Sequence, residues 1–150
     1  SEMCIRDRYD IPPRSIEIEL TESLFYNDMK SLSVLVSRIH HAGLSCSIDD
    51  FGSGYSSLNM LKDVKVDALK LDRVFFESGD NDERGKDIIQ SVIKLAQALD
   101  LHTISEGVEE RKQVEFLKEM HCDLIQGYVF AKPMPVPEFE QLAFGTEAAD

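Results

Sequence analysis

The chain has 150 residues, of which 43% are hydrophobic and 29% are charged, a composition typical of a soluble globular domain. Its 28 acidic residues exceed its 16 lysines and arginines and give a net charge of −12. Non-specific binding to nucleic acid requires a basic surface that displaces counterions, so this charge argues against a nucleic-acid polymer as partner. The acidic excess is compatible with carboxylates that hold divalent cations, although most of it need only serve solubility.

The cysteines and histidines form no recognisable ligand pattern. Cys4, Cys46 and Cys122 are widely spaced, which indicates neither a disulfide framework nor a zinc motif and fits a reducing cytoplasm. No apolar run is long enough to cross a membrane, and no signal peptide is visible, although a parent protein could carry an anchor upstream. We interpret the four histidines as structural or surface residues: His40, His41, His102 and His121.

Residues 1–8 (SEMCIRDR) have no clear periodicity and run directly into a strand-like segment. We interpret them as a non-native or disordered tail, and we expect the native chain to have been cut at this point. The domain is therefore expected over residues 9–144. The small and polar residues 145–150 are expected to be a frayed tail.

The first expected elements are a strand, a helix and a second strand. Residues 16–20 (IEIEL) alternate apolar and acidic side chains at the period of two that a strand requires. Apolar residues then recur at helical spacing from Leu32 through Leu35 and Val36 to Ile39, and Gly43 is placed to end the helix. Residues 44–48 (LSCSI) predict the second strand, which leads into Asp49-Asp50 and the glycine-rich FGSG.

A short helix at 57–61 and a third strand at 67–71 (DALKL) are expected next. The polar residues 81–85 then lead into a strong amphipathic helix. The apolar face of that helix is predicted to comprise Ile88, Ile89, Val92, Ile93, Ala96 and Leu99.

The last expected elements repeat the same alternation. Residues 102–105 predict a fourth strand, and residues 109–120 predict a charged amphipathic helix. Residues 123–126 predict a fifth strand. A final helix is expected over 137–142, with a proline near its first turn.

Five strands separated by helices predict parallel βα units. Such units build either an open doubly wound sheet or a closed (β/α)₈ barrel. No glycine-rich dinucleotide fingerprint follows the first strand, which argues against the open dinucleotide-binding sheet. The predicted fold class is therefore α/β, with about five βα units of a TIM-like barrel.

Polar side chains lie at or just after the end of every expected strand. The strand ends of a (β/α)₈ barrel open on one face, which holds the active site, so these residues are expected to converge there. Converging carboxylates repel one another and divalent cations relieve that repulsion, which predicts Mg²⁺ or Mn²⁺. The residues are Glu19 with Glu22, Asp49 with Asp50, Lys70 with Asp72, Glu106 with Glu109, and Gln126.

These residues also have a simpler interpretation. Each acid taken alone could cap the helix that follows it. Lys70 is harder to explain in that way, because an ammonium group within an apolar strand needs an anionic partner. The residues by themselves indicate a metal-dependent barrel enzyme.

Four segments resemble the motifs of EAL domains, a family of cyclic-di-GMP phosphodiesterases, and they follow one another in the family's order. They are IELTES (18–23), DDFGSGYSSLNMLKDVKVDALKLDR (49–73), SEGVE (105–109) and QGYVFAKPMP (126–135). The resemblance covers residues 9–144 and corresponds to the C-terminal part of the domain. The Glu-Ala-Leu strand end that names the family and a strand with a metal-binding asparagine are absent from the sequence.

The resemblance implies roles for individual residues. The implied metal ligands are Glu19, Asp49, Asp50 and Glu106. The implied catalytic residues are Lys70, which orients and helps to activate the attacking water, and Glu106, as ligand or base. Glu22 would tether the DDFGSG loop, and Asp72 and Glu109 would support the site. The implied contacts to the dinucleotide are Gln126, Gly127 and Tyr128.

The function implied by the resemblance is hydrolysis of cyclic-di-GMP to linear pGpG by the intact parent domain, with two Mg²⁺ or Mn²⁺ ions. A cytoplasmic location, a homodimer and upstream sensory or diguanylate-cyclase domains are also expected. Because a whole barrel needs roughly 250 residues, the isolated chain is expected to be inactive and poorly stable. The alternatives are a cyclic-di-GMP receptor without turnover, a half-barrel interaction module, and another metal-dependent barrel hydrolase.

Overall fold

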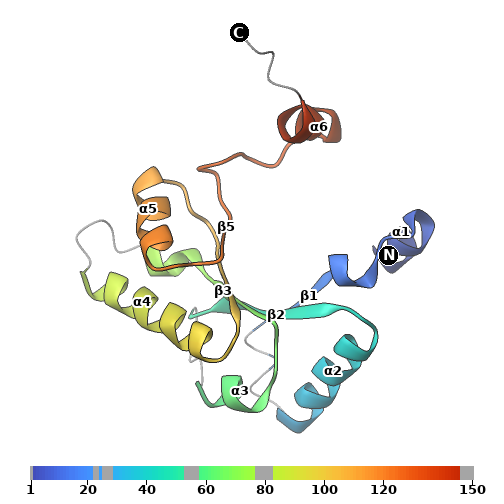
Figure 1. Cartoon of the computed structure of the whole chain (residues 1–150), viewed down its shortest axis with the longest axis horizontal. Helices are drawn as coiled ribbons and strands as arrows, with labels where there is room; N and C mark the ends of the chain where they lie inside the picture. Colours follow the sequence, from blue (N-terminus) through green and yellow to red (C-terminus); the bar gives the residue numbers. More distant parts are fainter. Residues whose placement is uncertain (1, 22–23, 25–28, 53–57, 77–82, 146–150) are drawn as a thin grey trace.

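The computed structural model describes residues 2–21, 24, 29–52, 58–76 and 83–145. Within them, five parallel strands form one sheet in the order β1-β2-β3-β4-β5 (Figure 1). The strands are β1 (Glu17–Thr21), β2 (Ser45–Phe51), β3 (Ala68–Leu71), β4 (His102–Ser105) and β5 (Leu124–Ile125). The α-helices are α1 (Glu2–Tyr9), α2 (Met29–His41), α3 (Leu58–Asp63), α4 (Glu83–Ala98), α5 (Arg111–Glu119) and α6 (Val136–Phe144). Two 3₁₀ turns, η1 (Pro13–Ser15) and η3 (Arg73–Phe76), complete the elements.

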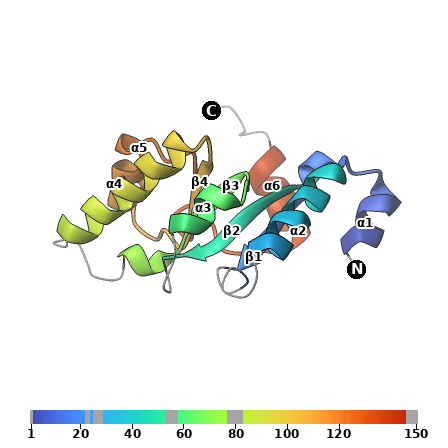
Figure 2. The same ribbon diagram turned by 90° about the horizontal axis from the view of Figure 1, so that it is seen from below.

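The helices between the strands form a layer along one face of the sheet. Helices α2 to α5 lie to one side of the strands in Figure 1, and α2, α3 and α4 stand in front of them in Figure 2. Helix α2 packs on β2 and α4 packs on β4. Strands that follow one another in the sequence are also adjacent in the sheet, as in the wall of a βα barrel.

The core lies between this helix layer and the sheet. Strand β3 is buried along its whole length, and Ile48 of β2 is fully buried beside it. Helix α4 contributes Ile89, Ile93 and Ala96, which are spaced at i, i+4 and i+7 and so form one stripe. Burial of this apolar surface is the main favourable contribution to the stability of the fold.

Three apolar residues of the expected helix patterns are exposed, contrary to their predicted place on the buried face. Leu35 in α2 and Ile88 in α4 lie beside the buried stripes rather than on them, because successive helical residues are rotated by roughly 100°. Leu99 lies beyond the last residue of α4. The buried stripe of each helix is thus narrower than its run of apolar residues.

Strand β2 is longer than expected and continues through the two aspartates to Phe51. The pairing with β3 shifts register between Ile48 and Phe51, and Asp50 has a φ of 56°. Such an irregularity is a β-bulge, which lets the strand continue and bury Phe51. Gly52 follows with a φ of 96°, a conformation that glycine adopts without strain.

An aspartate precedes each of two strands and bonds to the strand before it. Asp67 Oδ2 accepts a hydrogen bond of 2.8 Å from the backbone N–H of Cys46, the second residue of β2. Asp123 Oδ2 accepts bonds from the backbone N–H and the hydroxyl of Thr103, the second residue of β4, at 2.8 and 2.9 Å. These hydrogen bonds lower the pKa of Asp123 although its burial alone would raise it. We call these two residues, with their hydrogen bonds, the aspartate latches: Asp67 joins β2 to β3, and Asp123 joins β4 to β5.

The terminal segments bear on the expected domain limits. Helix α1 covers most of residues 1–8, and the division of the domain at residue 9 stays a prediction. Residues 146–150, most of the expected C-terminal tail, lie outside the described residues. All side chains of α6 are exposed. Among the described residues, the helices are too short or too polar to cross a lipid bilayer.

Candidate active site

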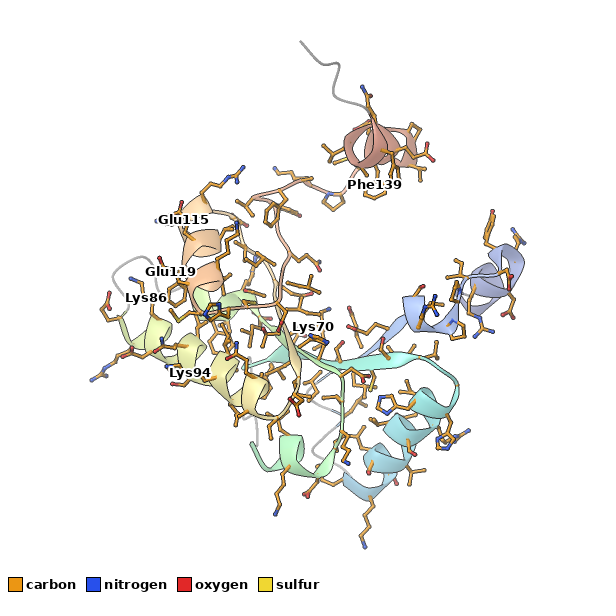
Figure 3. The ribbon with its side chains drawn as sticks, in the orientation of Figure 1. Lys70, Lys86, Lys94, Glu115, Glu119 and Phe139 are labelled. Carbon is orange, nitrogen blue, oxygen red and sulfur yellow. The ribbon has the colours of Figure 1, made fainter. Side chains whose placement is uncertain are left out.

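Three carboxylates surround the ammonium group of Lys70. Lys70, labelled in Figure 3, is only 6% exposed. Lys70 donates a hydrogen bond to Glu19 and forms an ion pair of 2.8 Å with Glu106 Oε1. Its Nζ lies 3.4 Å from Asp49 Oδ1. The anionic partners that a lysine within an apolar strand requires are therefore supplied by β1, by β2 and by the residue that follows β4.

The register of the sheet explains this convergence. Glu19 pairs with Ser47, and Ser47 pairs with Ala68, so these three residues share one face of the sheet. Asp49 and Lys70 lie two residues further along β2 and β3, and side chains two residues apart in a strand point to the same face. All these positions lie toward the carboxyl ends of parallel strands, where (β/α)₈ enzymes place their active sites.

Lys70 is positively charged at neutral pH. Burial lowers the pKa of its ammonium group, but the hydrogen bonds to Glu106 and Glu19 and the charge of Asp49 outweigh burial, and the pKa is raised above its usual value. A lysine in this state cannot accept a proton. It can donate hydrogen bonds and can stabilise negative charge that develops beside it.

The cluster has a chemistry that suits divalent cations. Three carboxylates and one ammonium group leave an excess charge of −2, and carboxylate oxygens are the ligands that Mg²⁺ prefers. Within the part of the chain that the structure describes, the buried Asp49 Oδ1 accepts no hydrogen bond and lies 3.4 Å from Lys70 Nζ. Burial, the charge of Asp49 and a hydrogen bond with Asp72 raise the pKa of Asp50. In the described residues, the acids of this cluster surround the ammonium group, and no three of them have oxygens within 4.8 Å of one another.

The supporting residues proposed from the sequence have distinct local environments. Asp72 Oδ1 accepts a hydrogen bond of 2.7 Å from the backbone N–H of Val74 and so caps the turn η3. The backbone N–H groups of Glu109 and Glu110 both donate to Gln113 Oε1, at 3.0 and 2.9 Å, which fixes the start of α5. Glu22 lies outside the described residues.

The three expected substrate contacts follow β5. The backbone N–H of Gln126 donates to the carbonyl of Ser105 at 2.8 Å, which continues the pairing of β4 and β5. Gly127 lies so close to the backbone of Val108 that a side chain there would collide with it. Tyr128 is exposed, and Lys132 Nζ lies 5.4 Å from the centre of its ring. An exposed aromatic ring beside a cation is suited to stacking with a base.

The structure also gathers His40, Cys46 and Asp67 into a compact group. No spacing in the sequence marks this group, because its members lie 6 and 21 residues apart, in α2, in β2 and just before β3. Only the pairing of β2 with β3 and the packing of α2 on β2 bring them together.

Comparisons with known proteins agree on one family. The family model "EAL domain" matches residues 2–133. Cyclic di-GMP phosphodiesterase NbdA of Pseudomonas aeruginosa is 42% identical over 126 residues, which cover 84% of this chain and 16% of NbdA. Cyclic di-GMP phosphodiesterase RocR of the same organism is 40% identical over 139 residues, which cover 92% of this chain and 35% of RocR. The chain thus spans a minor part of the length of these curated relatives.

Solved structures agree with the sequence comparison. The EAL domain of DcpA from Mycobacterium smegmatis matches with a TM-score of 0.83 and 34% identity over 93% of this chain and 62% of that domain. A MucR phosphodiesterase in complex with c-di-GMP matches with a TM-score of 0.83 and 34% identity over 91% of this chain and 56% of that structure. The expected α/β fold of a TIM-like barrel is confirmed. The chain belongs to the EAL domain family.

Proposed function

We propose that the EAL domain represented by this chain hydrolyses cyclic-di-GMP to linear pGpG with the help of divalent cations. The observation that carries the proposal is the group of three carboxylates around the protonated Lys70 at the carboxyl ends of the strands. An anionic substrate would be repelled by such a group alone. Cations that offset the acids would make the same site attractive to a phosphodiester.

The proposed metal ligands are Glu19, Asp49, Asp50 and Glu106, and the proposed ions are two Mg²⁺ or Mn²⁺. When bound, such ions neutralise phosphate charge and lower the pKa of a bound water. The ligand set is supported by its donor chemistry, since all four side chains offer carboxylate oxygens.

Lys70 is proposed to act as a hydrogen-bond donor and as a fixed positive charge. Its Nζ would orient the attacking water and would stabilise the negative charge that develops on the phosphoryl oxygens. The water gives up a proton, for which Glu106 is the proposed acceptor, and forms a new P–O bond. One P–O bond of the ring breaks, and the released ribose oxygen takes up a proton. The second phosphodiester stays intact, which gives linear pGpG.

Several further assignments belong to the same proposal. Glu22, Asp72 and Glu109 are proposed to support the loops around the site, and Gln126 with Gly127 and Tyr128 is proposed to contact the dinucleotide. The names of NbdA and RocR and the c-di-GMP bound to the MucR phosphodiesterase support the substrate. A calcium and c-di-GMP complex of BlrP1 from Klebsiella pneumoniae supports a cation in the site.

The cellular setting is proposed on the same basis. A cytoplasmic location and a homodimeric parent protein are expected. Sensory or diguanylate-cyclase domains are expected upstream. A diguanylate-cyclase domain is supported by a relative from Pseudomonas aeruginosa, 35% identical, that is named bifunctional diguanylate cyclase/cyclic di-GMP phosphodiesterase MucR.

The proposal is tested by incubating the natural protein that contains this chain with cyclic-di-GMP and Mn²⁺ or Mg²⁺, with separation of the products by anion-exchange chromatography. We expect pGpG to form, EDTA to stop its formation, and Lys70→Met to lower kcat. Lys94→Met, at an exposed position of α4, is the matched control and should leave kcat unchanged. Binding of cyclic-di-GMP without any pGpG would instead identify a receptor. The same assay on the 150-residue chain tests the expectation that it is inactive alone.

A further inference from the structure

His40, Cys46 and Asp67 lie together between the sheet and helix α2. His40 is in the last turn of α2, Cys46 is the second residue of β2, and Asp67 directly precedes β3. The His40 Nε2 atom lies 2.9 Å from Asp67 Oδ2 and 3.7 Å from Cys46 Sγ. Among the described residues, this is the group whose imidazole, thiol and carboxylate atoms all lie within 4.8 Å of one another.

The geometry of the group is not that of a nucleophilic cysteine. A Cys-His-Asp triad places the thiol and the carboxylate on opposite nitrogens of the imidazole ring. Here Cys46 Sγ and Asp67 Oδ2 both approach the same nitrogen, Nε2 of His40. Three donor atoms that converge on one point instead form the arrangement that surrounds a metal ion.

The distances suit a tetrahedral ion. Zinc with bonds of about 2.3 Å to sulfur and about 2.0 Å to nitrogen or oxygen separates sulfur from nitrogen by roughly 3.5 Å and nitrogen from oxygen by roughly 3.3 Å. The corresponding separations here are 3.7 and 2.9 Å. Side-chain shifts of a few tenths of an ångström would thus make His40, Cys46 and Asp67 three ligands of one ion.

Burial determines how such an ion would enter. Cys46 is fully buried, whereas the side chains of His40 and Asp67 are 36% and 42% exposed. An ion could therefore arrive from solvent at the imidazole and the carboxylate and reach the thiol behind them. The exposed side leaves room for a fourth ligand, as in zinc sites with three protein ligands and a water.

We propose that His40 Nε2, Cys46 Sγ and Asp67 Oδ2 bind one Zn²⁺ ion, with water as the fourth ligand. The mixture of thiolate, imidazole and carboxylate favours a borderline ion such as Zn²⁺ over Mg²⁺ or Ca²⁺, which prefer ligand sets made of oxygen. Binding replaces the S–H bond of Cys46 by an S–Zn bond, and the thiol proton leaves to solvent.

The electrostatic setting explains why the thiol keeps its proton without an ion. Burial, together with the negative charges of Asp67 and Glu17, raises the pKa of Cys46 to about 11. A divalent cation between the thiol and Asp67 would reverse this effect, because the carboxylate would then face the metal rather than a thiolate. Cys46 is therefore expected to be inert toward alkylating reagents at neutral pH and to become a ligand only with the ion.

This site is separate from the proposed active site. Cys46 and Asp49 lie three residues apart on β2 and so point to opposite faces of the sheet. Asp67 directly precedes β3, three residues before Lys70. Three residues of strand correspond to about 10 Å. Zinc here would join α2, β2 and β3 at the amino ends of the strands, and we expect it to stabilise the fold rather than to react with substrate.

The test uses the untagged 150-residue chain after removal of metals with EDTA, since a histidine tag would itself bind the probe. Calorimetric titration with Zn²⁺ is expected to show one site per chain. Co²⁺ is expected to give the thiolate-to-metal charge-transfer band and the visible bands of a tetrahedral ion. Absence of both signals in a chain that far-UV circular dichroism shows to be folded would overturn the proposal.

Variants locate the site. Cys46→Ser should abolish the charge-transfer band, and His40→Gln should weaken Zn²⁺ binding by at least about tenfold. Cys122→Ser and His41→Gln are the matched controls, because they remove a cysteine and a histidine outside the group, and both should bind like the unaltered chain. Loss of binding in the controls but not in Cys46→Ser would refute the assignment.

Two further measurements keep the outcome clear. His40 is partly exposed at the end of a helix, so His40→Gln is expected to fold even if Cys46→Ser does not. Lys70→Met should retain Zn²⁺ binding, which separates this site from the proposed active site. The unaltered chain in urea should lose the tetrahedral cobalt spectrum, and a spectrum that persists there would show binding to unfolded chain and so contradict the proposal.

Discussion

Replacement of Lys70 by methionine removes the buried ammonium group while it keeps most of the side-chain volume. Glu106, Asp49 and Glu19 would then face one another without a cation among them. In the unaltered chain, Lys70 has a raised pKa in the folded state. Its contribution to stability is therefore fully present below its unfolded-state pKa, near 10.5, and is lost only as the pH rises through the higher folded-state value.

The expected loss follows from the partners' exposure. One pair of unit charges at 4 Å contributes about 4 kcal/mol at an effective dielectric constant of 20. Breaking a fully buried ion pair costs roughly 3–5 kcal/mol. The side chains of Asp49, Glu106 and Glu19 are 20%, 23% and 52% exposed, so solvent screens them in part. We therefore expect Lys70→Met to lower the free energy of unfolding by about 2–3 kcal/mol at neutral pH.

The assay is urea unfolding followed by far-UV circular dichroism at pH 7 and at pH 9. Both pH values lie below the unfolded-state pKa of Lys70, so the loss should be the same at the two. Lys94→Met, on the exposed face of α4, should change stability by less than about 0.5 kcal/mol. If Lys70→Met matched that control, or if its loss disappeared at pH 9, the electrostatic account of the site would be wrong.

Three other substitutions test the structure away from the ammonium group. Asp123→Asn should cost about 1 kcal/mol at neutral pH, because Thr103 would donate to a neutral acceptor. Since the pKa of Asp123 is lowered below its usual 3.8, the difference should disappear as the pH falls through that folded-state pKa, and urea titrations at pH 7 and at a pH well below 3.8 check this. Gln113→Ala should cost about 1 kcal/mol through loss of the cap of α5, measured as a lower midpoint in urea. Gly52→Ala should cost about 1–3 kcal/mol, because its positive φ disfavours a side chain and the new methyl would collide with Phe75; an unchanged thermal midpoint would argue against this loop geometry.

Much of the fold could be predicted from periodicity. The alternation of apolar and acidic residues at 16–20 corresponds to β1, and residues 102–105 are β4 with the expected bounds. These predictions succeed because one face of each element is buried and the other is not, which imposes a period on the sequence. The ammonium group of Lys70 required anionic partners for a similar physical reason, and three acids contact it.

The features that could not be predicted depend on contacts between distant elements. The extension of β2 through Asp50 requires a bulge with a positive φ, which is uncommon for a residue other than glycine, so the sequence indicated a strand end before the aspartates. The group of His40, Cys46 and Asp67 has no local signature at all. Its existence depends on which turn of α2 packs against β2, and that is decided by tertiary packing rather than by spacing.

The aspartate latches also determine where the polar side chains of the site point. Lys70 is the third residue after Asp67, and Gln126 is the third residue after Asp123. If β3 slipped by one residue against β2, the bond from the Cys46 backbone would break and Lys70 would turn toward the apolar helix layer. The two aspartates thus fix the register of the strands at their amino ends. A register error there would misplace the side chains of the site, although the site lies about 10 Å away.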